Sequence, residues 1–417
     1  MSAAVFSVVF AAFVVAALAW RTWLALRQAR HVARNRERVP PDFAPIIPLE
    51  AHQRAADYTL DKLNLGVVES LAIDGVLVLA LTLGGGIAAI DALAARLLGE
   101  GTARDLATVF GVLLVTTLAA LPFDAWRTFA IEGRHGFNRT SLAVFALDIV
   151  KGAALSVALG TPLLLGVFWL VEAAGPLWWL YTWIVWIAFT LVLVMVFPRW
   201  IAPLFNRFTP LEEGELRRRI EALLERCGFH AEGLFVMDGS RRSTHGNAYF
   251  TGFGTNKRIV FFDTLMERLT PSEIEAVLAH ELGHFARRHI PRLLAVRFGL
   301  ALLLLGILGW MYQEPAFYQA LKLPAPHIGA ALAGFALAVP VFTFPFQPLA
   351  SLIARRQEFE ADAYAASHAS AADLMSALAK LYRDNAATLT PDPLHSLVYD
   401  SHPPAVLRIA HLRNTPQ

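Results

Sequence analysis

Residues Ser272–Ile290 read SEIEAVLAHELGHFARRHI and contain the pentad His280-Glu281-Leu282-Gly283-His284. Histidines four residues apart lie on one face of a helix, so both imidazoles can reach one metal ion. Glu281 follows the first histidine and points beside that ion, where a general base for an attacking water belongs. The pentad therefore predicts a metal-dependent hydrolase.

The residues around the pentad predict the helix that this chemistry needs. Thr270 and Glu273 have the spacing of a capping box, and Pro271 stands at the first helical position. A chance grouping of two histidines and a glutamate would not need such helix signals. The core face of the helix is predicted by an apolar stripe at Ile274, Val277, Leu278 and Phe285.

The composition is that of a polytopic membrane protein. Of 417 residues, 56% are hydrophobic and only 17% are charged, and the mean hydropathy is +0.48. A net charge of +2 gives no reason to expect a nucleic-acid partner. The single cysteine, Cys227, excludes an internal disulfide and a thiolate zinc site. Metal ligands must therefore be His, Asp or Glu.

Seven apolar runs predict seven membrane-spanning helices. Several reach the roughly 20 residues that cross a bilayer, and the others do so with their flanks. The runs are Ala3–Trp20, Gly75–Ile90, Leu106–Phe123, Gly152–Val171, Pro176–Pro198, Phe298–Tyr312 and Ile328–Ile353.

The positions of the arginines predict the orientation in the membrane. Arginines follow the first run, occur in Trp126–Ser141 and follow the last run, whereas Glu172–Gly175 and Gln313–Pro326 nearly lack basic residues. Because basic loops stay in the cytoplasm, we expect the N-terminus outside and the C-terminus inside.

The expected fold is an all-α polytopic membrane protein with a cytoplasmic α+β metallopeptidase domain. Residues 1–198 would hold five spans, 199–290 the cytoplasmic part with the pentad, 291–353 spans six and seven, and 354–417 a cytoplasmic C-terminal part. The four segments place the two cytoplasmic parts on either side of the last two spans.

The cytoplasmic interval before the pentad predicts one helix and a small sheet. Thr209 and Glu212 would cap a helix over Leu211–Arg226, which Gly228 would end. Gly246–Phe250 is a candidate edge strand that pairs with an extended substrate; plain structural pairing is the alternative. The sheet strands are predicted at Leu234–Met237, Ala248–Phe250 and Ile259–Phe262.

Two histidines leave a catalytic zinc one protein ligand short, and the run after the seventh span, RRQEFEADAYA, offers carboxylates. Glu358 and Asp362 lie one helical turn apart. We expect Glu358 to be the third ligand and Asp362 to hold a histidine ring in its correct tautomer. Glu360 would point to another face. The alternative is a solvated charged patch that pairs with Arg355 and Arg356.

The remaining candidates are polar residues that could assist. We expect one Zn²⁺ per chain, with Glu281 moving the proton from water to the leaving amine. His402 and Arg408 could stabilise an oxyanion, and Asn247 could hold substrate, although each could equally be a solvated polar residue. The other histidines are expected to be surface or packing residues: His245, His289, His368, His395 and His411.

Several blocks of this sequence resemble one family, the integral-membrane zinc CAAX prenyl endopeptidases of the sterile-mutant type (type 1). HELGH alone is shared by many peptidases, whereas the combination in this order is specific. The blocks are EGRHGFNR (132–139), GSRRSTHGNAYF (239–250), NKRIVFFDTL (256–265), HELGH (280–284), EFEAD (358–362) and SHPP (401–404).

The resemblance implies seven helices in a barrel around a chamber, capped by the zinc peptidase domain. It implies removal of the last three residues after a prenylated cysteine. His280, His284 and Glu358 match the family's zinc ligands and Glu281 its catalytic glutamate. The family's positions for substrate and transition state are matched by Asn247, His402 and Arg408.

The expected partners are a peptide or lipidated-peptide substrate and membrane lipid, with no nucleic acid, and the chain is expected to be a monomer. Short loops, a tail without a retrieval signal and Ala- and Arg-rich usage favour a bacterial cytoplasmic membrane over the endoplasmic reticulum. Most bacteria are not expected to prenylate proteins, so another substrate stays open.

Three other functions are compatible with parts of the sequence. A quality-control protease of the heat-shock type would share the zinc site. A transporter could use intramembrane carboxylates such as Glu69 and Asp74. A non-catalytic zinc-binding scaffold would not need Glu281. The HGFN and SHPP blocks argue against the heat-shock type, and the intact Glu281 argues against a scaffold. Glu69 and Asp74 lie near the expected cytoplasmic edge of the second span, and no pair of Gly- or Pro-broken segments in matching halves indicates transporter repeats.

Overall fold

The computed structural model describes residues 2–251, 258–324 and 326–414. Asn256 and Lys257, which begin one of the family-like blocks, lie outside the described residues. Among the described residues most are helical, and one small sheet is present.

The membrane-spanning part consists of long helices with short helices between them. Its first half contains α1 (Ala3–Asn35), α2 (Leu49–Ser70), α3 (Val78–Leu81), α4 (Gly86–Leu98), α5 (Thr102–Ala125), α6 (Leu142–Ala173), α7 (Trp178–Val196) and α8 (Ala202–Phe205). Its second half contains α12 (His289–Met311), α13 (Pro315–Ala320), α14 (Ile328–Thr343) and α15 (Gln347–His368).

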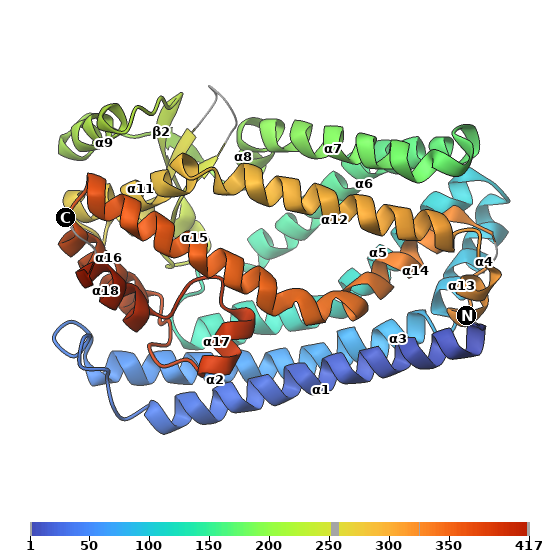
Figure 1. The fold of residues 1–417 in the computed structure, drawn as a ribbon, viewed down its shortest axis with the longest axis horizontal. Helices are drawn as coiled ribbons and strands as arrows, with labels where there is room; N and C mark the ends of the chain where they lie inside the picture. The colour runs from blue at the N-terminus through green and yellow to red at the C-terminus, as the bar shows by residue number, and fades with distance from the viewer. Residues whose placement is uncertain (1, 252–257, 325, 415–417) are drawn as a thin grey trace.

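The remaining elements form the domain that carries the pentad. They are β1 (Phe208–Pro210), α9 (Glu215–Arg226), β2 (Gly233–Met237), β3 (Ala248–Thr251), β4 (Arg258–Phe262), α10 (Asp263–Met266), α11 (Pro271–Ala286), α16 (Ala371–Asp384), α17 (Pro393–Tyr399) and α18 (Ala405–Asn414). In Figure 1, α9, α11, α16 and α18 gather at one end of the long helices, opposite the N-terminus.

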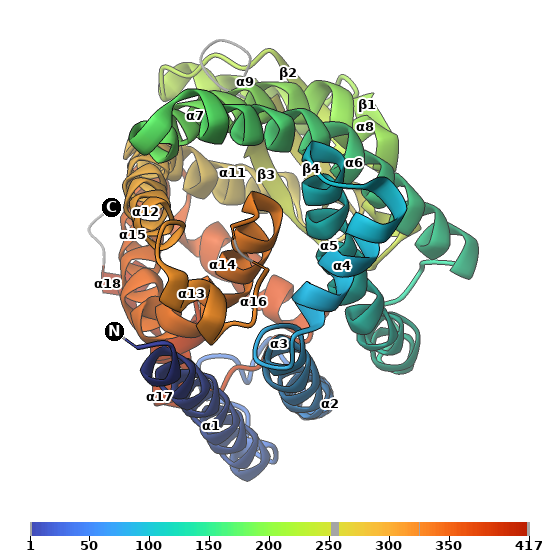
Figure 2. The same ribbon diagram turned by 90° about the vertical axis from the view of Figure 1, so that its right-hand side faces the viewer.

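Within the described residues, seven helical stretches are long and apolar enough to cross a membrane, as the sequence predicts. Seen from the end in Figure 2, the long helices are arranged in a ring. The stretches run Ala3–Asn35, Leu49–Leu81, Thr102–Glu132, Leu142–Ala173, Gly175–Phe205, His289–Met311 and Ile328–His368. The predicted fold class, a polytopic helical membrane protein with a small-sheet domain, is confirmed.

The predicted bounds of the second span, Gly75–Ile90, are wrong. The helix begins at Leu49 and the chain turns at Gly85, whose φ is +80°. Hydropathy misses the first half of this helix because it is polar, and its carboxylates are paired with neighbouring helices. Asp74 accepts from Arg21 at 2.5 Å, Asp61 accepts from Arg134 at 2.9 Å, and Glu69 pairs with Arg127.

The sheet has the order β1-β2-β4-β3, with only the central pair, β2 and β4, parallel. The three predicted strands are confirmed, and β3 lies at an edge as expected. Sequence reasoning misses β1, which has only three residues and ends in a proline. The predicted cap at Thr209 is wrong because Thr209 pairs with Val236 in the sheet, and α9 instead begins after Gly214. The predicted end of that helix near Gly228 is confirmed.

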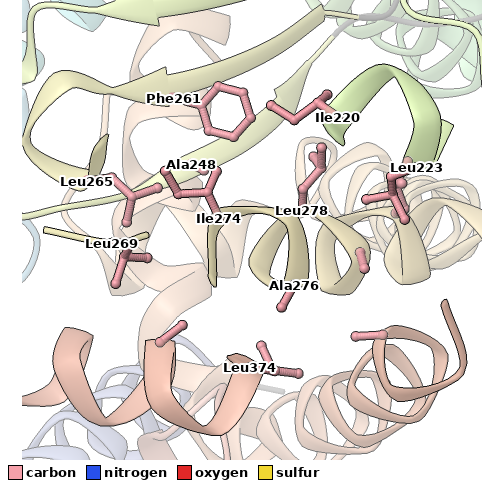
Figure 3. Packing of buried hydrophobic residues seen from close by; sticks show 14 of the residues in the cluster. Ile220, Leu223, Ala248, Phe261, Leu265, Leu269, Ile274, Ala276, Leu278 and Leu374 are labelled. Atoms are coloured by element: carbon pink, nitrogen blue, oxygen red, sulfur yellow. The ribbon is translucent and has the colours of Figure 1, made fainter. Parts of the chain in front are cut away.

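A buried apolar core joins the sheet to the helices packed around it (Figure 3). Full burial of a large apolar side chain stabilises the fold by about 1.5–3 kcal/mol. The core fixes α11, the helix of the pentad, from both sides. It includes Ile220 and Leu223 of α9, Phe261 of β4, Ile274 and Leu278 of α11, and Leu374 of α16.

Glu273 links α11 to α16. Its carboxylate accepts hydrogen bonds from Lys380 and Ser376, each at 2.7 Å, and from the Thr270 amide at 2.8 Å. Burial raises the pKa of Glu273, but these donors lower it by more, so the net pKa is below its usual value.

We expect Glu273→Gln to lower the free energy of unfolding by about 1–3 kcal/mol, since it removes charge-assisted hydrogen bonds. Because the folded-state pKa is lowered, the loss is complete above the unfolded pKa of about 4.3 and disappears as the pH falls through the folded value. Denaturant unfolding of both proteins in mixed micelles between pH 3 and pH 8 measures this. An equal gap at every pH would contradict it.

Candidate metal and catalytic site

Helix α11 starts as the sequence predicts. The Thr270 side chain accepts from the Glu273 amide, the Glu273 side chain accepts from the Thr270 amide, and Pro271 occupies the first helical turn. These caps set the register that places His280 and His284 on the same face. Their Nε2 atoms lie 3.3 Å apart.

Gly283 explains how a second helix comes within reach of the two histidines. A Cβ on Gly283 would lie 2.9 Å from Ala361 Cα and 3.1 Å from Ala361 O. Both contacts are with backbone atoms, so a larger residue would push α15 away. The absent side chain allows α15 to pack directly on α11, with Glu358 opposite the histidines.

The three side chains His280, His284 and Glu358 form one cluster whose ligand atoms lie within 4.8 Å of one another. Glu358 Oε1 lies 3.3 Å from His284 Nε2, and Glu358 Oε2 lies 3.5 Å from His280 Nε2. A tetrahedral ion with bonds of about 2.0–2.2 Å holds its ligand atoms about 3.3–3.6 Å apart. The donor set and its spacing therefore fit a zinc ion.

Asp362 lies behind His280, on the side away from the cluster. Its Oδ1 is 2.8 Å from His280 Nδ1, and the carboxylate is fully buried. Arg408 donates to the same carboxylate from Nε at 2.8 Å and from Nη2 at 2.5 Å. Asp362 thus contacts the ring nitrogen of His280 that faces away from Glu358. A solvated charged patch at Glu358 and Asp362 is excluded by their burial.

The pKa of His280 is raised on balance. Burial lowers the pKa of His280, but its hydrogen bonds to Asp362 and Glu358 raise it by more, to about 9. A metal ion requires the neutral imidazole, so a metal ion at this site would compete with protons for His280.

Glu281 lines a cavity of about 110 Å³ next to the cluster. The cavity is also lined by Asn247, His402 and Arg408, and its apolar wall comes from Leu265, Val277, Leu374, Leu378 and Leu381. Burial raises the pKa of Glu281, and His280 and His284 oppose this effect only in part. A carboxylate with a raised pKa is a better proton acceptor near neutral pH.

The structure places the three remaining predicted residues around that cavity. Asn247 is exposed and directly precedes edge strand β3. His402 Nδ1 lies 2.7 Å from Glu358 Oε2, and its side chain is 62% exposed. Arg408 is buried, with Nη1 3.5 Å from Glu358 Oε2. All three therefore share the space that Glu281 faces.

Sequence reasoning misses the contact of His289 with His284 and Glu360 beside the metal cluster. His289, expected to be a surface or packing residue, is 3% exposed, with its Nδ1 3.0 Å from His284 Nδ1. Its Nε2 lies 3.0 Å from Glu360 Oε2. Glu360 does point away from the metal cluster, as predicted. The spacing of five residues between His284 and His289 gives no periodic signal, because a helix break separates them.

The family-like loop before α6 holds the chain that leads into β3. Glu132 accepts from the Tyr58 hydroxyl and lies 3.4 Å from His245 Nε2. The Phe137 ring stacks on His245 with centroids 4.5 Å apart. His368, another histidine expected to be a surface or packing residue, stacks on Tyr364. His245 is thus a packing residue that fixes the approach to Asn247.

This fold and site define a class: a multi-pass membrane protein with a metallopeptidase domain at one end of its helices. Two family profiles divide the chain between them. Residues 28–207 match the CAAX prenyl protease N-terminal region with five membrane helices, and residues 210–416 match peptidase family M48.

Relatives match over nearly the whole chain. A CAAX prenyl protease 1 homolog of Oryza sativa subsp. japonica is 34% identical over 96% of this chain and 96% of its own. One of Homo sapiens is 31% identical over 95% of this chain and 93% of its own. The crystal structure of S. mikatae Ste24p superposes with a TM-score of 0.91 at 29% identity, covering 98% of this chain and 99% of that one.

The chain therefore belongs to the CAAX prenyl protease 1 family of M48 peptidases. It is a membrane-embedded metalloendopeptidase, and the family implies a metal ion, typically zinc. The comparisons do not favour a heat-shock protease, a transporter or a scaffold. In the structure, Glu69 and Asp74, the candidate coupling groups of a transporter, are both paired with arginines.

Proposed function

We propose that this protein binds one Zn²⁺ per chain through His280, His284 and Glu358 and cleaves membrane-associated peptides near their C-terminus. The proposed substrates are CAAX-type peptides, prenylated or similarly lipidated. The observation that carries the proposal is a cluster with zinc-ligand spacing beside a cavity that Glu281 lines. The relatives' names support the substrate class.

The proposed chemistry divides into the metal's contribution and that of the side chains. A bound zinc ion lowers the pKa of a water ligand and polarises the scissile carbonyl. Glu281 accepts the proton of the attacking water and delivers it to the leaving amine. Arg408 and His402 line the same cavity and are placed to donate to the developing oxyanion.

Substrate binding is proposed to use edge strand β3 and the apolar wall. One side of β3 pairs with β4 and the other is at the edge of the sheet, so an extended peptide can add to it. Asn247 stands at the start of that edge. Five leucine and valine side chains line the cavity, which suits aliphatic residues of a peptide C-terminus.

The experiment that tests this function uses purified protein in detergent with a farnesylated CAAX peptide and an unprenylated copy. We expect release of the C-terminal tripeptide, preference for the farnesylated copy, loss of activity with a chelator and recovery with zinc. If the protein holds one equivalent of zinc but cuts neither peptide, the proposed substrate class is wrong. If it binds no zinc, the proposed site is wrong.

The proposed orientation places the N-terminus outside and the metal site in the cytoplasm, and the proposed host membrane is the bacterial cytoplasmic membrane. Short loops and Ala- and Arg-rich composition support this. The protein is proposed to act as a monomer in contact with lipid. A cysteine at exposed Glu221 of α9, in a Cys227→Ser background, should react with an impermeant maleimide in intact cells only after permeabilisation. Labelling of intact cells would show that α9 lies outside the cytoplasm and that the proposed orientation is wrong.

A further inference from the structure

His289 and Glu360 lie beside the metal cluster and outside the cavity that the proposed mechanism uses. His289 is the first residue of α12, and Glu360 lies on α15 between Glu358 and Asp362. His289 is 3% exposed, whereas the Glu360 side chain is 48% exposed. A buried imidazole between His284 and a carboxylate can fix the orientation of the His284 ring.

The ring contacts fix which nitrogen of each histidine does what. His284 Nε2 faces His280 and Glu358, so this is the atom available to a metal ion. With a metal ion on Nε2, Nδ1 of His284 would carry the proton and donate to His289 Nδ1, which lies 3.0 Å away. His289 must in turn carry its own proton on Nε2, and it donates that proton to Glu360 Oε2 at 3.0 Å.

The backbone is shaped to make this contact. Arg288, between α11 and α12, has φ +55° and ψ +38°, the left-handed conformation that non-glycine residues seldom adopt. This turn ends α11 after the pentad and brings His289 back over His284, with ring centroids 5.1 Å apart. A strained residue at this position is consistent with a functional contact next to it.

We propose that His289 and Glu360 form a positioning pair that holds His284 in the tautomer and ring orientation that bind zinc. The chain Glu360–His289–His284 is the counterpart, on the second histidine, of the contact between Asp362 and His280. It differs in reaching its carboxylate through an interposed imidazole. Neither His289 nor Glu360 is among the described residues that line the cavity, so we expect the pair to act on the metal and not on the peptide.

The inference rests on the proposed function, because it assumes that His284 is a zinc ligand. Partners of metal-binding histidines typically change metal affinity by 10–100-fold when removed. We expect this loss for His289→Leu, which fills the space but cannot accept a hydrogen bond. His289→Asn keeps an acceptor oxygen near the Nδ1 position and should recover most of the affinity.

The test measures zinc affinity by chelator competition, together with the visible spectrum of the Co²⁺-substituted protein. His289→Leu and Glu360→Ala should bind zinc more weakly and shift the cobalt bands, whereas His289→Asn and Glu360→Gln should resemble wild type. The double variant His289→Leu/Glu360→Ala should lose little more affinity than His289→Leu alone. The matched control is His52→Leu, since His52 is similarly buried at 2% exposure and, among the described residues, hydrogen-bonds only to the Asn35 carbonyl, on a different helix pair.

The outcomes separate the two proposals. If wild type binds no zinc, the proposed function fails. If wild type binds zinc and His289→Leu binds it within twofold with an unchanged cobalt spectrum, the positioning pair is wrong and the proposed function stands. If His289→Leu does not fold, Glu360→Ala decides, because its side chain is half-exposed and its loss should not unfold the protein.

Discussion

Glu281→Gln is expected to lower kcat for peptide hydrolysis by about 10³–10⁴-fold while leaving zinc content unchanged. Glutamine has the shape of glutamate but cannot accept the proton of the attacking water, and general-base catalysis contributes up to about 10⁴-fold. Glu281 lines the cavity beside the metal cluster and is not one of its three members. The substitution therefore removes the base and keeps the site.

The measurement is single-turnover cleavage of the farnesylated peptide together with zinc analysis of the same samples. Glu267→Gln is the matched control, because Glu267 is exposed and precedes the metal helix. It should behave like wild type in both assays. Activity of Glu281→Gln within tenfold of wild type would assign the proton transfer to another group. Loss of zinc from the variant would instead place Glu281 in the metal site.

Much of the fold could be predicted because its causes are local. The capping box at Thr270 and the helical spacing of the pentad need no tertiary information, and the structure shows both. Apolar runs predict seven spans because a bilayer imposes a length. Hydropathy misplaces the second span for a tertiary reason: its polar half is stable because Asp61, Glu69 and Asp74 pair with arginines from helices distant in the sequence.

The candidate site divides in the same way. Glu358 and Asp362 could be proposed because a zinc site with two histidines requires a carboxylate, and their spacing puts them on one helical face. His289 and Glu360 could not, since their contact depends on the left-handed turn at Arg288 and on the packing of α15 against α11. No periodic pattern in the sequence predicts the turn at Arg288 or the packing of α15 against α11. The role of Gly283 cannot be predicted from the sequence either, because it depends on the close packing of α15, whose backbone a side chain at this position would clash with.

Asp362→Ala is expected to have the largest effect on stability, lowering the free energy of unfolding by about 3–5 kcal/mol. Asp362 is fully buried and holds both Arg408 and His280 Nδ1. Removing one partner of a buried ion pair is costly, and without Asp362 the buried Arg408 keeps, among the described carboxylates, only the longer 3.5 Å contact with Glu358. Zinc affinity should also fall by about 10–100-fold, since His280 loses the group that orients it.

A double-mutant cycle shows whether the poorly compensated charge of Arg408 causes this loss. In Asp362→Ala/Arg408→Ala that charge is gone, so the double variant should be less destabilised than the sum of the two single variants, with a coupling of about 0.5–3 kcal/mol. Denaturant unfolding in mixed micelles measures it. The comparison pair is Asp42 and Arg413, which lie 2.5 Å apart at the surface, where Asp42→Ala should cost at most about 1 kcal/mol. Additive losses of unfolding free energy would show that Asp362 stabilises the fold by packing. A zinc affinity of Asp362→Ala equal to that of wild type would show that His280 is oriented by its helix alone.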